Sequence, residues 1–382
     1  MIRLTIPSIE KDDLKAVSEV LNSGYLVQGS WVARFESEVA NYVGCKYAVA
    51  VSSCTAALHL ALLAISVSPG DLVIVSSYSW PATANVVELC RAQPVFVDIQ
   101  PDSFNIDPDR LENTLIKLMV NPETAKRVKA IIPVHTFGQL ANMSSILEIA
   151  ERYQIPVVED AACALGATLN SKNAGSWGIM GCFSFHPRKA ITTGEGGMIT
   201  TNDPNLVRKL RALRNHGIDP DIPTTDFILP GFNYRITEFQ AALGITQMRK
   251  LERIIIRRRR SAAYYNYLLK DTNLQQPIVS NDNKHIYQSY VIMLPQRIAS
   301  ERDEIIAHLK NYGIETTIGT WNIPLTTYFR SRYGYKNEDF PVVDHVFKRS
   351  LTLPLYEGIL ETDQETVVNC LIQKINNYED AK

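Results

Sequence analysis

Short apolar runs alternate with longer amphipathic windows through the first two thirds of the chain. The apolar runs predict strands at residues 47–51, 72–76, 94–98, 130–134, 156–160, 181–185 and 197–201. The windows between them predict helices over residues 55–67, 82–91, 108–120, 144–153 and 204–215. Several of the runs are apolar at every position, so we expect helices on both faces of the sheet. This alternation is typical of an α/β fold with a mostly parallel sheet, whose ligand site lies at the carboxyl ends of the strands.

The pattern changes after about residue 250. A long charged helix is predicted over 248–270, a strand over 289–295 and a helix over 300–314. A chain of 382 residues with 46% hydrophobic residues is long enough for two cores. We therefore predict a large domain over residues 1–250 and a smaller α+β domain over residues 251–382.

The charges of the chain nearly cancel. Thirty-nine Lys and Arg residues stand against 40 Asp and Glu residues, which gives a net charge of -1. No overall field attracts nucleic acid or anionic lipid, so we expect neither partner. The run Arg257–Arg260 lies in a helical window where consecutive residues point in different directions, and we interpret it as a solvated or interface face.

Residues 47–70 contain no Asp, Glu, Lys or Arg, which raises the question of a membrane span. The polar residues 52–55 and His59 interrupt this segment, so we interpret it as a buried strand followed by a buried helix. The first residues show no apolar stretch typical of a signal peptide. The six cysteines are scattered without a CxxC pair, which favours the reducing cytoplasm and no metal site.

Two polar features lie at predicted junctions between strands and helices. Asp160 ends a strand, where it either caps the next helix or holds a protonated ring nitrogen of a bound heterocycle. The stretch SSCTAA at 52–57 is either an ordinary helix cap or a cradle for a small phosphate, because N–H groups at a helix N-terminus bind anions.

Two more candidates follow strands. Trp80 is either a core residue or a ring that stacks on a flat ligand. Lys189 is either a surface lysine or an amine that forms an imine with an aldehyde, a role that desolvation supports by lowering the pKa of a lysine. An amine, a strand-end acid, a phosphate cradle and a stacking aromatic together form the set that pyridoxal 5'-phosphate requires.

The sequence resembles the DegT/StrS family of pyridoxal-phosphate sugar aminotransferases, a branch of the aspartate aminotransferase (type I) fold. The resemblance covers nearly the whole chain and rests on these ordered motifs: SGYLVQGSWVARFE, VSSCTAALHLALLA, PGDLVIV, PVFVDI, IPVHTFGQ, VVEDAACALGA, CFSFHPRKAITTGEGGM, LRNHG, GFNYRITEFQAALG and LPLYEG.

The resemblance implies roles for individual residues. Lys189 matches the Schiff-base lysine, which also moves the proton between substrate and cofactor. Asp160 matches the acid that keeps the pyridinium protonated, and Trp80 matches the aromatic residue stacked on the ring.

The phosphate site is implied in the same way. Cys54, through its backbone, Thr55 and Ser184 match phosphate-binding positions. Asn233 matches a residue that reaches the phosphate from a second subunit, so the resemblance implies a homodimer with shared sites.

The sequence departs from the family at two places. Cys163 stands where Gln or His often contacts the phenolic oxygen of the cofactor, and a thiol is a weaker donor. The loop 318–329 lacks the histidine that the family often carries near the sugar. One subgroup of the fold has His at the lysine position and performs dehydration, and Lys189 argues against that chemistry.

The resemblance implies ping-pong amino transfer. Glutamate or glutamine gives its amino group to the cofactor, leaving pyridoxamine phosphate, and a nucleotide-linked keto sugar then receives it. The stretch ITTGEGG is more similar to members that act at C4, which favours a 4-keto-6-deoxyhexose. The alternatives are a 3-keto sugar or cyclitol ketone, and a non-catalytic regulatory protein that binds the cofactor.

Overall fold

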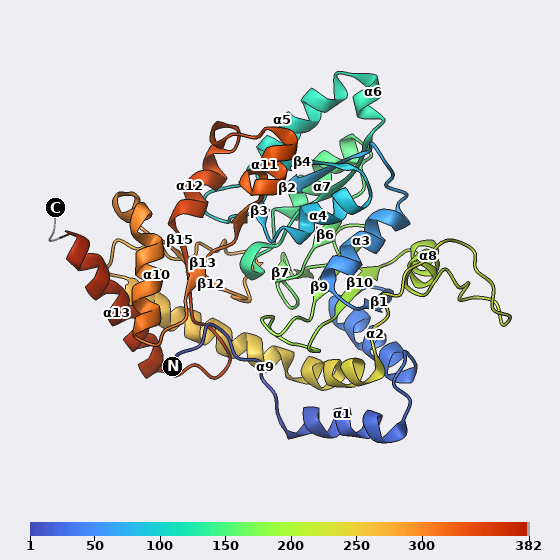
Figure 1. Ribbon diagram of the computed structural model, residues 1–382, viewed down its shortest axis with the longest axis horizontal. Coiled ribbons are helices and arrows are strands. Elements are labelled where there is room, and N and C mark those ends of the chain that lie inside the picture. Colours follow the sequence, from blue (N-terminus) through green and yellow to red (C-terminus); the bar gives the residue numbers. More distant parts are fainter. Residues whose placement is uncertain (380–382) are drawn as a thin grey trace.

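A computed structural model describes residues 1–379 and confirms the alternating architecture (Figure 1). A four-stranded sheet has the order β1-β10-β9-β6, and a three-stranded sheet has the order β4-β2-β5. Their strands are β1 (Tyr47–Val51), β2 (Leu72–Ser76), β4 (Gln93–Val97), β5 (Val128–Ile132), β6 (Val158–Asp160), β9 (Met180–Ser184) and β10 (Gly197–Thr201). Each predicted strand is present, with its bounds within two residues of those expected.

The two sheets are joined along β6. Parallel bridges join Ile131 to Val157 and Val134 to Asp160, and so connect β5 to β6. The pairs β6–β9, β2–β4 and β2–β5 are also parallel, whereas β10 runs antiparallel to both of its neighbours. The predicted mostly parallel sheet is therefore confirmed, and Asp160 lies at its carboxyl edge.

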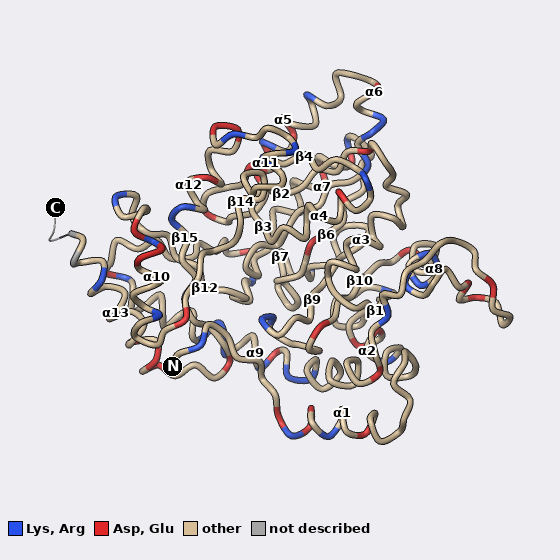
Figure 2. Tube along the Cα trace, in the orientation of Figure 1, with Lys and Arg blue, Asp and Glu red and all other residues tan. Residues whose placement is uncertain are grey.

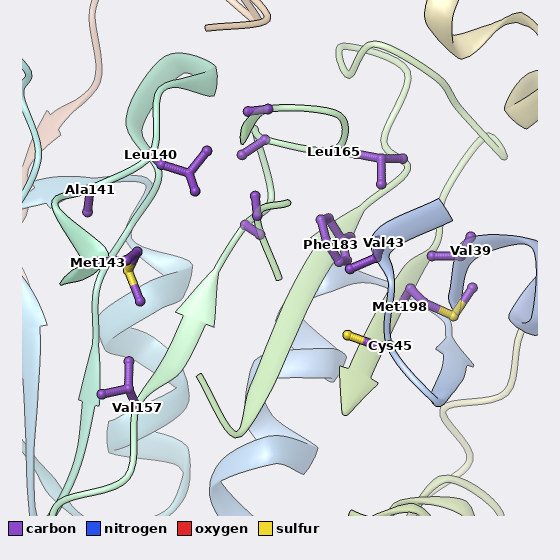
Figure 3. Packing of buried hydrophobic residues seen from close by; sticks show 14 of the residues in the cluster. Val39, Val43, Cys45, Leu140, Ala141, Met143, Val157, Leu165, Phe183 and Met198 are labelled. Atoms are coloured by element: carbon purple, nitrogen blue, oxygen red, sulfur yellow. The ribbon is translucent and has the colours of Figure 1, made fainter. Parts of the chain in front are cut away.

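Helices cover both faces of this sheet, as the alternation of side chains along β1 shows. Ala48 and Ala50 belong to a core cluster with α2 (Ser30–Val43), α5 (Pro108–Met119) and α7 (Met143–Arg152), part of which Figure 3 shows. Val49 and Val51 belong to a second cluster with α3 (Cys54–Ala64), α4 (Ala82–Leu89) and α8 (Pro204–Arg214). Successive strand residues point to opposite faces, so both faces are buried.

The uncharged segment 47–70 forms β1 and α3. Nearly every residue of α3 is buried, and this helix of 11 residues is too short for the roughly 20 residues that a bilayer requires. Among residues 1–379, none of the helices has both the length and the apolar character needed to cross a membrane. The interpretation as a buried strand and a buried helix is therefore confirmed.

The long helix α9 (Glu238–Leu269) begins ten residues earlier than predicted. Thr237 and Gln240 form a capping box that fixes its first turn. Glu238 also accepts hydrogen bonds from the main-chain N–H groups of Gly29, Trp31 and Val32, at 2.8 to 3.0 Å. The start of α9 thereby caps the start of α2.

The first helix, α1 (Lys11–Ser23), packs along α9. Asp13 is fully buried and accepts hydrogen bonds from Thr246, Gln247 and Lys250 of α9. Burial acts to raise the pKa of Asp13, but these hydrogen bonds, that from Lys250 foremost, hold it below its ordinary value of 3.8.

A third core cluster belongs to the C-terminal region. It joins the later half of α9 to β12 (Tyr290–Met293), α10 (Arg302–Asn311), β15 (Ser350–Leu353) and α13 (Glu361–Glu379). However, α11 (Thr327–Tyr333) and α12 (Pro341–Arg349) contribute to the second cluster. The domain division at residue 250 stays a prediction, and it would fall inside α9.

The remaining strands and the remaining α-helix are short. They are β3 (Tyr78–Ser79), α6 (Pro122–Ala125), β7 (Thr168–Leu169), β8 (Lys172–Asn173), β11 (Asn283–Lys284), β13 (Thr317–Ile318) and β14 (Trp321–Asn322). β14 pairs with β3, and this pairing attaches the C-terminal region to the segment that leads to Trp80.

The basic run on α9 differs in part from the expectation. Arg257 and Arg260 form ion pairs with Glu357 and Glu361 at the surface. Arg258 is only 2% exposed, and its guanidinium donates to three main-chain carbonyl groups. The interpretation as a solvated face is thus wrong for Arg258. Figure 2 shows charges of both signs along the chain, in agreement with the near-zero net charge.

Candidate active site

Asp160 lies at the end of β6 and is 4% exposed. Its Oδ2 accepts a hydrogen bond from Thr83 Oγ1 at 2.7 Å, and its Oδ1 accepts one from the N–H of Ala162 at 3.2 Å. Turns, not a helix, follow this residue, so it caps no helix. The structure thus places a buried carboxylate at the carboxyl edge of the sheet.

The surroundings of Asp160 favour a cationic ligand. Burial raises the pKa of its carboxyl group, although the hydrogen bonds from Thr83 and Ala162 and the positive charge of Lys189 act to lower it. A buried carboxylate gains most from a further positive charge placed beside it. A protonated ring nitrogen would supply that charge.

The neighbouring Glu159 is structural. It is completely buried, and its carboxylate accepts three main-chain N–H groups from residues 175–178 at 2.7 to 2.8 Å. It also accepts a hydrogen bond from His135 Nε2 at 2.8 Å. The N–H of Ala141 donates to His135 Nδ1, which places the ring hydrogen on Nε2. These contacts fix the strand end that carries Asp160.

Lys189 faces the same region from the loop after β9. Its Nζ lies 3.1 Å from Cys163 Sγ, and its main-chain N–H donates to the carbonyl of His186 at 2.8 Å. Burial lowers the pKa of Lys189, but the thiol groups of Cys163 and Cys54 and the carboxylate of Asp160 raise it above its ordinary value overall. The amine of Lys189 therefore contacts the residues of this region and is not that of a free surface lysine.

The turn before α3 has the expected helix cap. Ser53 Oγ accepts the N–H of Ala56 at 3.1 Å, which leaves the first N–H groups of the helix, those of Cys54 and Thr55, without a partner in the helix. Cys54 is buried and Thr55 is exposed. This arrangement suits a small anion such as a phosphate group.

The strand β10 approaches this turn closely. A Cβ atom on Gly197 would lie 2.4 Å from the carbonyl group of Ser53 and 2.7 Å from the nitrogen of Cys54. Gly197 is paired with Ser184 across β10 and β9. The glycine therefore allows the backbone to pass, and the sheet register brings the hydroxyl of Ser184 to the same side of the site as the turn.

Trp80 follows β3 and is 65% exposed, so the interpretation as a core residue is wrong. Its carbonyl accepts a hydrogen bond from the N–H of Thr83 at 3.2 Å. Thr83 also donates a hydrogen bond to Asp160. Thr83 therefore links the turn that carries Trp80 to the buried carboxylate. Sequence reasoning missed Thr83, although a hydroxyl in the first turn after Trp80 is a visible signal.

Asn233 is exposed, and its backbone pairs with Asn215 after α8. Within residues 1–379 no hydrogen bond joins it to the other candidate residues. Its expected contribution from a second subunit stays a prediction.

The donor set fits pyridoxal 5'-phosphate. A helix N-terminus with a glycine-lined turn follows β1, an exposed indole follows β3, a buried carboxylate ends β6, and a primary amine follows β9. The part of the chain that the structure describes contains no His, Cys, Asp and Glu group that could hold a metal ion.

Comparison with known proteins agrees with this geometry. Residues 7–372 match the DegT/DnrJ/EryC1/StrS aminotransferase family. The spore coat polysaccharide biosynthesis protein SpsC of Bacillus subtilis is 37% identical over 379 residues, covering 96% of this chain and 95% of that protein. GDP-perosamine synthase of Caulobacter vibrioides is 36% identical over 376 residues, covering 97% and 98%.

Solved structures agree as well. A putative sugar aminotransferase from Streptococcus pneumoniae, solved in its PMP-form, has a TM-score of 0.91 at 25% identity, covering 97% of this chain and 98% of that one. The same protein in its PLP-form has a TM-score of 0.90. This chain therefore belongs to the DegT/DnrJ/EryC1/StrS aminotransferase family and is a pyridoxal-phosphate-dependent aminotransferase of the type I fold.

Proposed function

We propose that the protein transfers the amino group of glutamate or glutamine to a nucleotide-linked 4-keto-6-deoxyhexose, for the synthesis of a surface polysaccharide or glycan. The observation that carries the proposal is the placement of Lys189 and Asp160 at one sheet edge. The charge of Lys189 acts to lower the pKa of Asp160, and that of Asp160 acts to raise the pKa of Lys189. Two relatives support the substrate class: one is named GDP-perosamine synthase, and the other a spore coat polysaccharide biosynthesis protein.

Pyridoxal phosphate, when bound, supplies an aldehyde that accepts the amino group and a protonated ring that withdraws electrons. Asp160 would hold the ring nitrogen, Trp80 a face of the ring, and Lys189 the aldehyde carbon. The N–H groups of Cys54 and Thr55, with the hydroxyl of Ser184, would hold the phosphate.

The protein supplies proton transfer and orientation. In the first half of the reaction, Lys189 Nζ takes the proton from the α-carbon of the amino acid. In the second half, it delivers a proton to the sugar carbon that receives the amine. Asp160, held by Thr83 and Ala162, stays ionised against the ring nitrogen.

We further propose a homodimer in which Asn233 completes the phosphate site of the other subunit. Several large apolar side chains support an interface, because they are exposed in the single chain: Tyr25 81%, Val27 68% and Phe227 61%. Light scattering should give the mass of a dimer. Asn233→Ala should weaken cofactor binding and leave that mass unchanged, and a fully active monomer would contradict site sharing.

The central test is Lys189→Ala in the full chain. We expect amino transfer to fall by at least roughly 10²-fold, because a positioned acid–base group contributes that much or more, while the far-UV circular dichroism stays the same. Lys126→Ala is the matched control, since that side chain is 72% exposed, and its activity should be unchanged. Retained turnover in Lys189→Ala refutes the role of this residue.

The substrate is tested with a panel of nucleotide-linked keto sugars and product detection by mass. We expect amination of a 4-keto-6-deoxyhexose with glutamate or glutamine as the donor. Preferred amination of a 3-keto sugar or a cyclitol ketone contradicts the substrate proposal but keeps the reaction. A protein that binds the cofactor but converts no keto substrate with any donor is the non-catalytic alternative.

A further inference from the structure

Cys163 differs from the other cysteines in its exposure. Cys163 is partly exposed, and the others are buried: Cys45, Cys54, Cys90, Cys182 and Cys370. Burial raises the pKa of the Cys54 and Cys182 thiols well above their ordinary value, which keeps these two groups protonated and unreactive. Cys163 is therefore the cysteine that a small oxidant can reach.

The partner of Cys163 is an amine. Lys189 Nζ lies 3.1 Å from Cys163 Sγ, a contact within hydrogen-bond distance for sulfur. The thiolate is the form of cysteine that attacks peroxides, and Lys189 Nζ is the nitrogen atom that lies beside this sulfur. Each residue lies on a loop that follows a neighbouring strand, β6 for Cys163 and β9 for Lys189, and the two strands are paired in parallel. The pairing of these two strands therefore positions the two residues next to each other.

We propose that Cys163 and Lys189 form an oxidation site, at which a peroxide joins Sγ to Nζ through a covalent S–N bond when Lys189 is not engaged with the cofactor. In the first step, the thiolate attacks hydrogen peroxide: an S–O bond forms, the O–O bond breaks and hydroxide leaves. Sulfur is oxidised and the peroxide is reduced. In the second step, the Lys189 amine attacks the sulfur of the sulfenic acid: the S–N bond forms, the S–O bond breaks and water leaves. Overall, one thiol, one amine and one peroxide give the linked pair and two molecules of water.

The first step prepares the second. Oxidation consumes the Cys163 thiol group that raises the pKa of Lys189, whereas the burial that lowers this pKa remains. The amine then loses its proton more readily and becomes a nucleophile. Sulfenic acids condense with nearby thiols or nitrogen atoms, and Lys189 Nζ is the nitrogen already in contact.

The consequence is a reversible block of the cofactor site. Lys189 cannot take up pyridoxal phosphate while its nitrogen is bound to sulfur, and a thiol reductant releases both residues. Cofactor already bound engages Nζ and prevents the second step. The site thus makes the cofactor-free protein, but not the loaded protein, sensitive to peroxide, whichever sugar the enzyme aminates.

The test treats the full-length protein with hydrogen peroxide, with and without bound cofactor, and maps tryptic peptides by mass. The peptide 153–172 contains Cys163 as its one cysteine, and 189–208 begins at Lys189 and contains none. We expect these two peptides to be joined, with a mass two hydrogens below their sum, in the cofactor-free sample only. Dithiothreitol should separate them and restore the absorbance that develops when pyridoxal phosphate is added.

Two variants separate chemistry from structure. Cys163→Ser should form no link, and its cofactor uptake should be the same before and after peroxide treatment. Lys189→Arg keeps the positive charge but cannot form the link, so its oxidation should stop at a sulfenic acid that dimedone traps. Circular dichroism confirms folding in both. The proposal is overturned if treated wild-type protein shows no 153–172 to 189–208 link, or if 153–172 is joined to 173–188 by a disulfide to Cys182.

Discussion

Replacing the buried Glu159 with Gln should destabilise the protein by about 2–6 kcal/mol. The carboxylate accepts two hydrogen bonds on each oxygen: Trp177 and Gly178 donate to Oε1, and His135 and Gly175 donate to Oε2. An amide keeps one acceptor oxygen and turns an NH₂ group toward the other two donors. His135 cannot become an acceptor at Nε2 without losing the hydrogen bond that its Nδ1 accepts. Two buried donors therefore lose their partner, at about 1–3 kcal/mol each.

Urea unfolding at one fixed protein concentration measures this loss. Glu123→Gln is the matched control, because the Glu123 side chain is 80% exposed, and its effect should stay within about 0.5 kcal/mol. A loss below about 1 kcal/mol in Glu159→Gln would refute the reasoning, since it would mean that the donors find other acceptors.

Three further predictions concern the site and the stability of the fold. Thr83→Val removes the hydrogen bond to Asp160 and should weaken cofactor binding about tenfold in an absorbance titration; unchanged affinity contradicts this. Gly175→Ala should cost about 1–3 kcal/mol in urea unfolding, because φ is +79° and the new Cβ would lie 2.3 Å from a ring carbon of Phe183; full stability contradicts this. The ionised Asp13 stabilises the fold fully above pH 3.8, and this stabilisation is lost as the pH falls through the lowered pKa of Asp13 in the folded protein. Asp13→Asn should therefore flatten this part of the curve of unfolding free energy against pH. A curve parallel to that of the wild type contradicts this.

The strands and most helices were predictable because burial on both faces leaves a local signal, a short apolar run between polar turns. The start of α9 was not. Residues 238–247 precede the charged stretch that marks this helix in the sequence. The capping box at Thr237 fixes the start of the helix by hydrogen bonds, which leave no periodic pattern of hydrophobic residues. Arg258 was misjudged because its partners are carbonyl groups about 30 and 100 residues away.

The site was predictable in its parts but not in its contacts. Asp160 and Lys189 are visible as strand-end residues. The hydrogen bond from Thr83 to Asp160 spans 77 residues, and the contact from Lys189 to Cys163 spans 26. The order of strands in the sheet brings these distant residues together, and local sequence patterns do not reveal that order. The residues around Lys189 also raise its pKa, an effect that depends on these contacts and has no signal in the sequence.

The cap that Glu238 places on α2 has a consequence for synthesis on the ribosome. The main-chain N–H groups of Gly29, Trp31 and Val32 receive their acceptor about 206 residues later in the chain. At 5–20 residues per second, that delay is roughly 10–40 s. Throughout this interval the nascent N-terminal helices lack the helix on which they pack, so a chaperone that binds apolar helices has a long opportunity to hold them. Folding of the first 43 residues therefore waits for α9 to emerge.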